Sequence, residues 1–134
     1  MKKILLVAVL SVLFCACNSV ILKPGVTYYA DFEDTDWIGG YTKEMYRIEL
    51  TIYEDGSVSG KMGALRENGE MVPEDRIGCA VLEGQWSEVS KNDKELIEID
   101  ATSRGQDVGP MYVDKDKYLY MNGINSKALK LQKK

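Results

Sequence analysis

Residues 45–65 read MYRIELTIYEDGSVSGKMGAL, and they decide the fold. In the first half of this stretch every second position is apolar, and the apolar residues are Tyr46, Ile48, Leu50 and Ile52. The positions between them carry charged or polar side chains. Because successive side chains of a strand point to opposite faces, this alternation predicts a strand with one buried face.

Register decides the turn that follows this strand. A two-residue loop of Asp55 and Gly56 would pair Ile52 with Ser59 and would place a polar side chain on the apolar face. A three-residue loop that ends at a left-handed Gly56 pairs Ile52 with Val58 instead. The other pairs of this register also keep one face apolar, and they are Leu50 with Gly60, Ile48 with Met62, and Tyr46 with Ala64. We therefore predict a type I turn with a glycine bulge.

Further segments with strand-like patterns flank this hairpin. They are VTYYADF (26–32), IGCAVLEGQWSEV (77–89), KELIEIDATS (94–103), PMYV (110–113), KYLYM (117–121) and KALKLQ (127–132). Turn signals lie between several of them, and the clearest are RENGE (66–70) and VDKDKY (113–118). The pattern predicts an all-β fold, a single antiparallel up-and-down β-barrel of seven to eight strands. A β-sandwich is the alternative, and the sequential hairpins favour the barrel.

Composition narrows the possible functions. The chain has 134 residues, of which 45% are hydrophobic, which suits one domain with its own core. It contains no histidine, so a histidine base, a Ser-His or Cys-His pair and an imidazole-bound metal are excluded. The net charge is −4, and removal of Lys2 and Lys3 with an amino-terminal signal would take it to −6. A phosphate backbone would repel such a chain, so we expect no nucleic acid as a partner.

The amino terminus has the form of a secretory signal. Two lysines precede the apolar run ILLVAVLSVLFCA (4–16), which is too short to cross a bilayer about 30 Å thick. Residues 1–16 are therefore predicted to be a signal peptide that is removed. This segment resembles a bacterial lipoprotein signal, in which a small residue precedes the cysteine that receives diacylglycerol. Ala16 and Cys17 match that motif, whereas Cys15 follows the bulky Phe14.

The resemblance implies lipidation of Cys17 and a place in the bacterial cell envelope. Asn18 follows the anchor cysteine, and this implies sorting to the outer membrane, whose lipid then holds the protein through the acylated Cys17. Residues 17–25 are predicted to be a lipid-anchored spacer and residues 26–134 the β-barrel domain. Cleavage by an ordinary signal peptidase, which would release a soluble protein, is the alternative. In the lipidated form Cys79 is the only free thiol, and we interpret it as a small buried residue of a strand.

The layout of the remaining chain is similar to that of small bacterial lipoproteins with a lipocalin-like barrel. The resemblance rests on the DGS hairpin, the later GQW, the LIEI strand, the KYLYM strand and the terminal ALKLQKK. The amino-terminal domain of copper-resistance and envelope-stress lipoproteins has a similar order, but it carries a Cys-x-x-Cys that this chain lacks. A metal-sensing role is therefore not carried over. The resemblance implies an interior that holds one small ligand.

Aromatic and apolar residues are the candidates for such an interior site. Possible ligand-lining residues are Tyr46, Ile48, Met62 and Trp86, which the alternation places on the inner face. The alternative is that Tyr46 and Trp86 simply fill the interior. Inside a small barrel, both arrangements obey the same alternation.

Acidic residues invite two other interpretations. DFEDTDW (31–37) holds four carboxylates, but Asp36 and Thr42 occupy the sixth and twelfth positions where a calcium loop needs glycine and glutamate. With 21 acids in the chain, no pair stands out for acid/base catalysis. We therefore expect no catalytic residue, no cofactor and no metal site.

The function predicted from the sequence is a non-catalytic binding module for a small apolar ligand or an envelope protein partner. One alternative is a periplasmic inhibitor of a cell-wall hydrolase such as lysozyme, for which VSGKM (58–62) has a weak Ser-Gly match at Ser59 and Gly60. Another is an accessory subunit of an outer-membrane assembly, which predicts an exposed apolar patch.

Overall fold

Alternating side chains form an antiparallel sheet in the computed structural model, which describes residues 21–34, 44–73, 79–124 and 126–134. The strands are β1 (Thr27–Asp34), β2 (Glu44–Ile52), β3 (Ser57–Ala64), β4 (Cys79–Lys91), β5 (Lys94–Ser103), β6 (Gln106–Val113), β7 (Tyr118–Tyr120), β8 (Ala128–Lys130) and β9 (Gln132–Lys133). The described residues contain no helix, and therefore no helix that could cross a membrane. The all-β prediction is confirmed.

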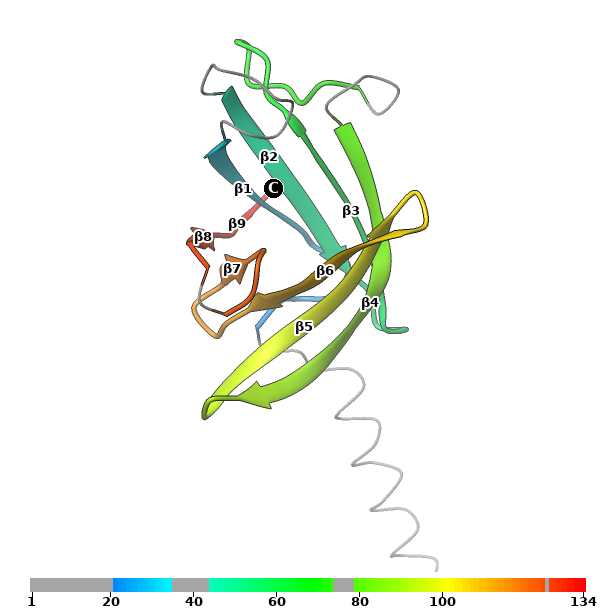
Figure 1. The fold of residues 1–134 in the computed structure, drawn as a ribbon, viewed down its shortest axis with the longest axis vertical. Coiled ribbons are helices and arrows are strands. Elements are labelled where there is room, and N and C mark those ends of the chain that lie inside the picture. Colours follow the sequence, from blue (N-terminus) through cyan, green and yellow to red (C-terminus); the bar gives the residue numbers. More distant parts are fainter. Residues whose placement is uncertain (1–20, 35–43, 74–78, 125) are drawn as a thin grey trace, which may run out of the picture.

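The strands follow one another across the sheet in the order β8-β7-β6-β5-β4-β3-β2-β1-β9. Each strand from β1 to β8 therefore pairs with its neighbours in the sequence, and every pairing is antiparallel. This is the predicted up-and-down order. Figure 1 shows how the long strands β2 to β6 twist and curl around the short carboxyl-terminal strands.

The predicted register of the β2–β3 hairpin is confirmed. Ile52 pairs with Val58, and the same register brings Ile48 opposite Met62. Gly56 has a φ of 91°, and its N–H donates to the carbonyl of Tyr53 at 3.0 Å. A left-handed residue closing a three-residue loop is the geometry of a glycine bulge. The buried apolar face has therefore fixed the register of this hairpin.

The sheet is not closed into a barrel, and in this respect the predicted barrel is wrong. β8 and β9 stand at opposite ends of the sheet although only Leu131 separates them in the chain. The first of these strands hydrogen-bonds to β7, and the second pairs with β1 only at Tyr28 and Tyr29. Leu131 itself donates its N–H to the carbonyl of Lys117 at 2.8 Å. The last part of the chain thus divides its hydrogen bonds between two strands, and β8 does not pair with β1.

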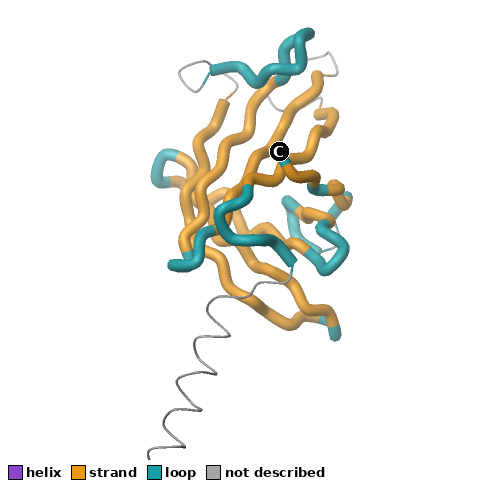
Figure 2. Tube along the Cα trace, turned by 180° about the vertical axis from the view of Figure 1, so that it is seen from behind, coloured by secondary structure: helices purple, strands orange, loops and turns teal. Residues whose placement is uncertain are grey.

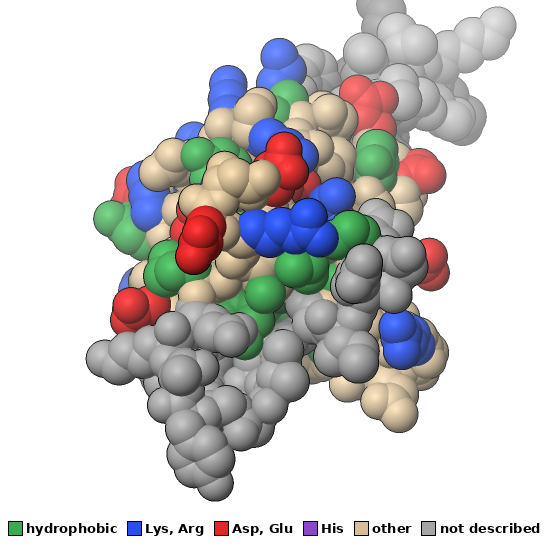
Figure 3. Space-filling view, turned by 90° about the horizontal axis from the view of Figure 1, so that it is seen from above, with side chains coloured by type: hydrophobic (Ala, Val, Ile, Leu, Met, Phe, Trp, Pro, Cys, Tyr) green, Lys and Arg blue, Asp and Glu red, His purple; other side chains and the backbone are tan. Residues whose placement is uncertain are grey.

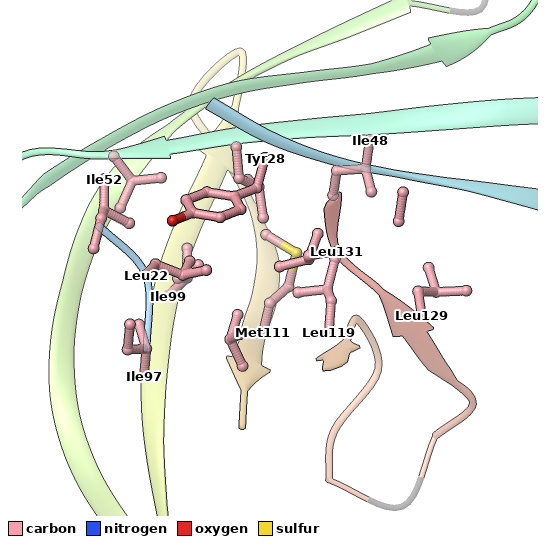
Figure 4. Packing of buried hydrophobic residues seen from close by; sticks show 14 of the residues in the cluster. Leu22, Tyr28, Ile48, Ile52, Ile97, Ile99, Met111, Leu119, Leu129 and Leu131 are labelled. Carbon is pink, nitrogen blue, oxygen red and sulfur yellow. The ribbon is translucent and has the colours of Figure 1, made fainter. Parts of the chain in front are cut away.

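The core fills the space that the curled sheet encloses. Its largest fully buried side chains come from β1, β2, β4, β5, β6 and β7, and they include Tyr28, Tyr46, Ile48, Leu82, Ile99 and Leu119. Leu129 and Leu131, from β8 and the residue before β9, complete the cluster. Figure 4 shows side chains of this cluster, among them Tyr28, Ile99 and Leu119, pointing toward one another from different strands. Burial of apolar surface at roughly 25 cal/mol per Å² is the main stabilising term.

Two core residues come from the predicted spacer. Ile21 is 5% exposed and Leu22 is 1% exposed, and both belong to the hydrophobic cluster. The segment is fastened to β2, because the N–H of Gly25 donates to the carbonyl of Ile52 at 2.8 Å. In Figure 2, which shows the molecule from behind, this stretch crosses the lower part of the sheet. The folded part therefore begins before the expected boundary at residue 26.

Other sequence predictions have mixed outcomes. Cys79 is buried at the start of β4, as expected. The RENGE turn forms a short hairpin, in which Leu65 bridges Met71. β6 begins at Gln106 and not at Pro110, and the β5–β6 register shifts between Asp100 and Thr102. The predicted strand at 110–113 is therefore the second half of a longer strand.

Candidate functional site

An apolar pocket of about 260 Å³ opens at the end of the sheet where β1 ends and β2 begins. Its walls come from strands that are distant in the sequence, and they are formed by Phe32, Ile48, Met62, Leu82, Met111 and Met121. Val108 and Asn122 complete the lining, and Val108 is 42% exposed. Figure 3 looks down on this end of the molecule, where hydrophobic side chains show between charged ones. We call this hollow the apolar pocket.

The position of the pocket follows from strand direction and alternation. Phe32 is near the end of β1 and Ile48 is near the start of β2, so the antiparallel pairing brings them to the same end. Met62 lies opposite Ile48 on β3, and Leu82 faces the same interior from β4. Alternate residues of neighbouring strands share one face of a sheet. The sequence therefore places these side chains on one wall once the register is known.

The lining has a simple chemistry. None of the described residues that line the pocket is charged, and the side-chain amide of Asn122 is the polar group among them. Met62, Met111 and Met121 contribute flexible thioethers, which adapt to ligands of different shape. A volume of about 260 Å³ is slightly below the usual range of small-molecule sites, roughly 300–1,000 Å³. The arrangement fits a small apolar group and offers nothing for acid/base chemistry.

Two of the four predicted lining residues are in the pocket wall. Ile48 and Met62 lie there. Tyr46 is not part of the lining; it is 2% exposed, and its ring stacks on Phe32 with the ring centroids 5.8 Å apart. Tyr46 therefore supports the wall from behind.

Trp86 lies near the other end of the sheet. It packs partly buried against the core, and its Nε1 donates to the carbonyl of Tyr53 at 2.7 Å. For Trp86 the alternative of a residue that fills the interior describes the structure. Alternation alone could not separate it from the lining residues, because it faces inward as they do.

Six residues of the described lining were missed in the sequence, and they are Phe32, Leu82, Val108, Met111, Met121 and Asn122. Phe32 and Leu82 lie in segments recognised as strands, so alternation was a usable signal for them. Met111 and Met121 come from β6 and from the residue after β7. Nothing in their local sequence says that the curl of the sheet will carry them across to β1 and β2.

A second hollow, of about 460 Å³, lies where β1 and β8 face each other without pairing. Its lining mixes apolar residues with charged ones, and the charged side chains are Asp31, Glu33, Lys127 and Lys130. Phe32 lines this hollow and the apolar pocket alike. We call this second hollow the seam groove.

In the acidic stretch at 31–37, the residues that the structure describes do not form a cation site. Arg47 holds Asp31 with two hydrogen bonds, Nε to Oδ1 at 2.6 Å and Nη2 to Oδ2 at 3.0 Å. This pairing raises the pKa of Arg47 above its usual value, mainly through the hydrogen bond to Asp31. Asp36 lies outside the described residues. Among those that are described, no three His, Cys, Asp or Glu side chains are placed to hold a metal ion.

Ser59 and Gly60, the weak match to a hydrolase inhibitor, lie inside β3. Ser59 pairs with Thr51 and Gly60 with Leu50, so neither residue is on a protruding loop. A β-carbon added at Gly60 would meet the backbone oxygen of Glu49 at 2.4 Å, which explains the glycine by close packing. The match therefore has a structural explanation.

Other perturbed groups lie away from the pocket. Burial, followed by a hydrogen bond to Asp114, raises the pKa of Tyr120. The pKa of Lys91 is raised by hydrogen bonds to Tyr112 and Glu98. Within the described ranges, every buried side-chain nitrogen or oxygen has a partner. These groups are accounted for by local pairing.

Comparison of the chain with family models, with curated proteins and with solved structures finds no match. The function is therefore argued from the site itself.

Proposed function

We propose that this protein is a lipid-anchored binding module of the cell envelope, which holds a small apolar ligand in the apolar pocket and catalyses no reaction. One observation carries the proposal. The pocket is open at one end of the molecule, and six apolar side chains, from five strands and the residue after β7, converge on it. Such a hollow with a single polar group is the usual form of a site for an apolar ligand.

The lipid anchor and a relation to lipocalin-like lipoproteins are part of the same proposal. The apolar run at 4–16 and the Ala16-Cys17 motif support an acylated Cys17 and attachment to the outer membrane. The sequential antiparallel strands around an apolar interior support a relation to lipocalin-like lipoproteins. A ligand bound inside such a sheet would be screened from water, and its release would need no chemistry.

Binding of the uncharged fluorescent probe N-phenyl-1-naphthylamine to the full chain tests the ligand site. Val108 is the variant position, because it is exposed at the pocket and its side chain can grow without disturbing the core. We expect Val108→Phe to narrow the entrance and to weaken probe binding by about tenfold or more, which corresponds to about 1.4 kcal/mol.

Val81→Phe is the matched control. Val81 is 39% exposed on β4, compared with 42% for Val108, and it lies outside the apolar pocket. The control should bind the probe as the unaltered chain does. Equal binding by all three proteins, or no binding by any of them, would contradict the proposed ligand site.

A further inference from the structure

The seam groove exists because the sheet leaves two strand edges unpaired. β9 accompanies β1 only as far as Tyr29, and β8 gives its hydrogen bonds to β7. From Ala30 to Glu33, β1 pairs with β2 on one side, and its other edge has no strand partner among the described residues. The hollow between these edges measures about 460 Å³ and is lined on one side by β1 and on the other by residues 127–130.

Phe32 connects the seam groove with the apolar pocket. Its side chain is 9% exposed and belongs to the core, and it lines both hollows. The two are therefore neighbours across one aromatic ring. A molecule that occupied both hollows would have to pass this ring.

The charges of the groove favour an anion. Asp31 is neutralised by Arg47 in a two-fold hydrogen bond. Lys130 donates to the backbone carbonyl of Asp116 and lies 4.7 Å from the ring centroid of Tyr118, but it forms no ion pair with a described carboxylate. Lys127 is exposed and is likewise without an ion pair in this part of the chain. Among the described residues of the groove, these two ammonium groups face one carboxylate outside an ion pair, that of Glu33.

The apolar pocket suits the apolar end of a ligand, and the seam groove suits a charged end. A charged head group is disfavoured in the apolar pocket, because none of its described lining residues carries a charge that would offset the desolvation. Val108 and Asn122, the two lining residues outside the apolar wall, are uncharged as well. At the seam it meets two lysines, which bind carboxylate or phosphate oxygens well.

We propose that the ligand is a single-chain amphiphile with an anionic head group. Its alkyl chain occupies the apolar pocket and passes Phe32, and its carboxylate or phosphate group lies in the seam groove beside Lys127 and Lys130. This inference rests on the proposed function, and it adds the class of the ligand and the place of its head group.

The test compares head groups on one alkyl chain. Decanoate, decyl phosphate, decanol and decyltrimethylammonium are used, each below the concentration at which it forms micelles, to displace N-phenyl-1-naphthylamine from the full chain. The two anions should bind about fivefold more tightly than decanol, and the cation more weakly than decanol. High salt should shrink these differences, because the lysines are exposed to solvent.

Two double variants, each of which removes two positive charges, test where the head group lies. Lys127→Gln with Lys130→Gln should remove the preference for the anions and leave decanol binding unchanged. The control is Lys94→Gln with Lys115→Gln, which removes the same charge from the start of β5 and the turn after β6, and neither residue lines either hollow. The control should keep the preference, and circular dichroism should show that both variants are folded.

Several results would overturn the inference. Equal affinity for anions and decanol, a preference for the cation, or the same loss in both double variants would each do so. If decanol still binds and Val108→Phe still blocks it, only the head-group inference fails and the ligand site stands. Vesicles of phosphatidylglycerol distinguish the source of the anion. Binding to vesicles without binding to decanoate or decyl phosphate would show a membrane surface contact and would also overturn the inference.

Discussion

The turn between β2 and β3 depends on one carboxylate. Ser57 donates twice to Asp55 Oδ1, from its hydroxyl at 2.6 Å and from its backbone N–H at 2.9 Å. These two bonds lower the pKa of Asp55, and the side-chain bond is the larger cause. An Asx-type bond of this kind prepares the chain for Gly56, which has a positive φ.

We expect Ser57→Ala to raise the pKa of Asp55 toward its ordinary value, because the larger cause of the lowering is removed. A depressed pKa in the folded state contributes stability above the unfolded value of about 3.9, and this stability is lost as the pH falls through the folded pKa. The variant should therefore lose part of the pH dependence of its stability in the acid range. A carboxyl-carbon NMR titration measures the shift. Ser87→Ala, at an exposed position of β4, is the control. An unchanged pKa of Asp55 in Ser57→Ala would contradict this explanation.

Strands β4 and β5 approach each other closely at Gly84. Gly84 pairs with Ala101, and a β-carbon added there would lie 1.9 Å from the backbone oxygen of Asp100. The register shift of β5 against β6 begins at the same Asp100. The irregular part of the sheet is thus packed against a residue that has no side chain, and glycine is required here by close approach.

Gly84→Ala should cost about 3 kcal/mol or more in the free energy of unfolding, because backbone and not a flexible side chain must move. Gly69→Ala is the matched glycine variant. Gly69 has a φ of 83° with no atom near the added carbon, so only the conformational cost of about 1 kcal/mol applies. Denaturant unfolding, followed by circular dichroism, measures both. A smaller loss for Gly84→Ala than for Gly69→Ala would show that the close approach does not limit the strand pair.

The same elements show how far the sequence predicts the structure. The β2–β3 register could be derived because an error of one residue would turn an apolar face outward. Residues 127–132 read as one strand, but the chain here forms two strands, β8 and β9, with different partners. Which strand accepts their hydrogen bonds depends on the curl of the whole sheet. Local alternation carries no information about that curl, so neither the open seam nor the groove could be predicted.

At the scale of the molecule, the two ends of the sheet have different roles. Ile21 and Leu22 are buried at the end where β1 begins, and the apolar pocket opens where β1 ends. Cys17 precedes Ile21 by four residues, and an extended chain covers at most about 3.6 Å per residue. An acyl group on Cys17 would therefore hold the closed end within about 14 Å of the membrane. The pocket would then face away from the lipid that anchors the protein, so a ligand could enter it from the aqueous side.

This orientation depends on the proposed acylation of Cys17, and Cys15 and Cys17 are a matched pair for the test. We expect Cys17→Ser to move the protein from the membrane fraction to the soluble fraction when the full chain is produced in a bacterium, because several acyl chains are lost together. Cys15→Ser should leave it in the membrane fraction, since the motif places Cys15 within the signal that is removed. Fractionation followed by mass spectrometry of the amino-terminal peptide measures both outcomes. Membrane retention of Cys17→Ser, or release of Cys15→Ser, would contradict the anchor, and with it the orientation of the pocket.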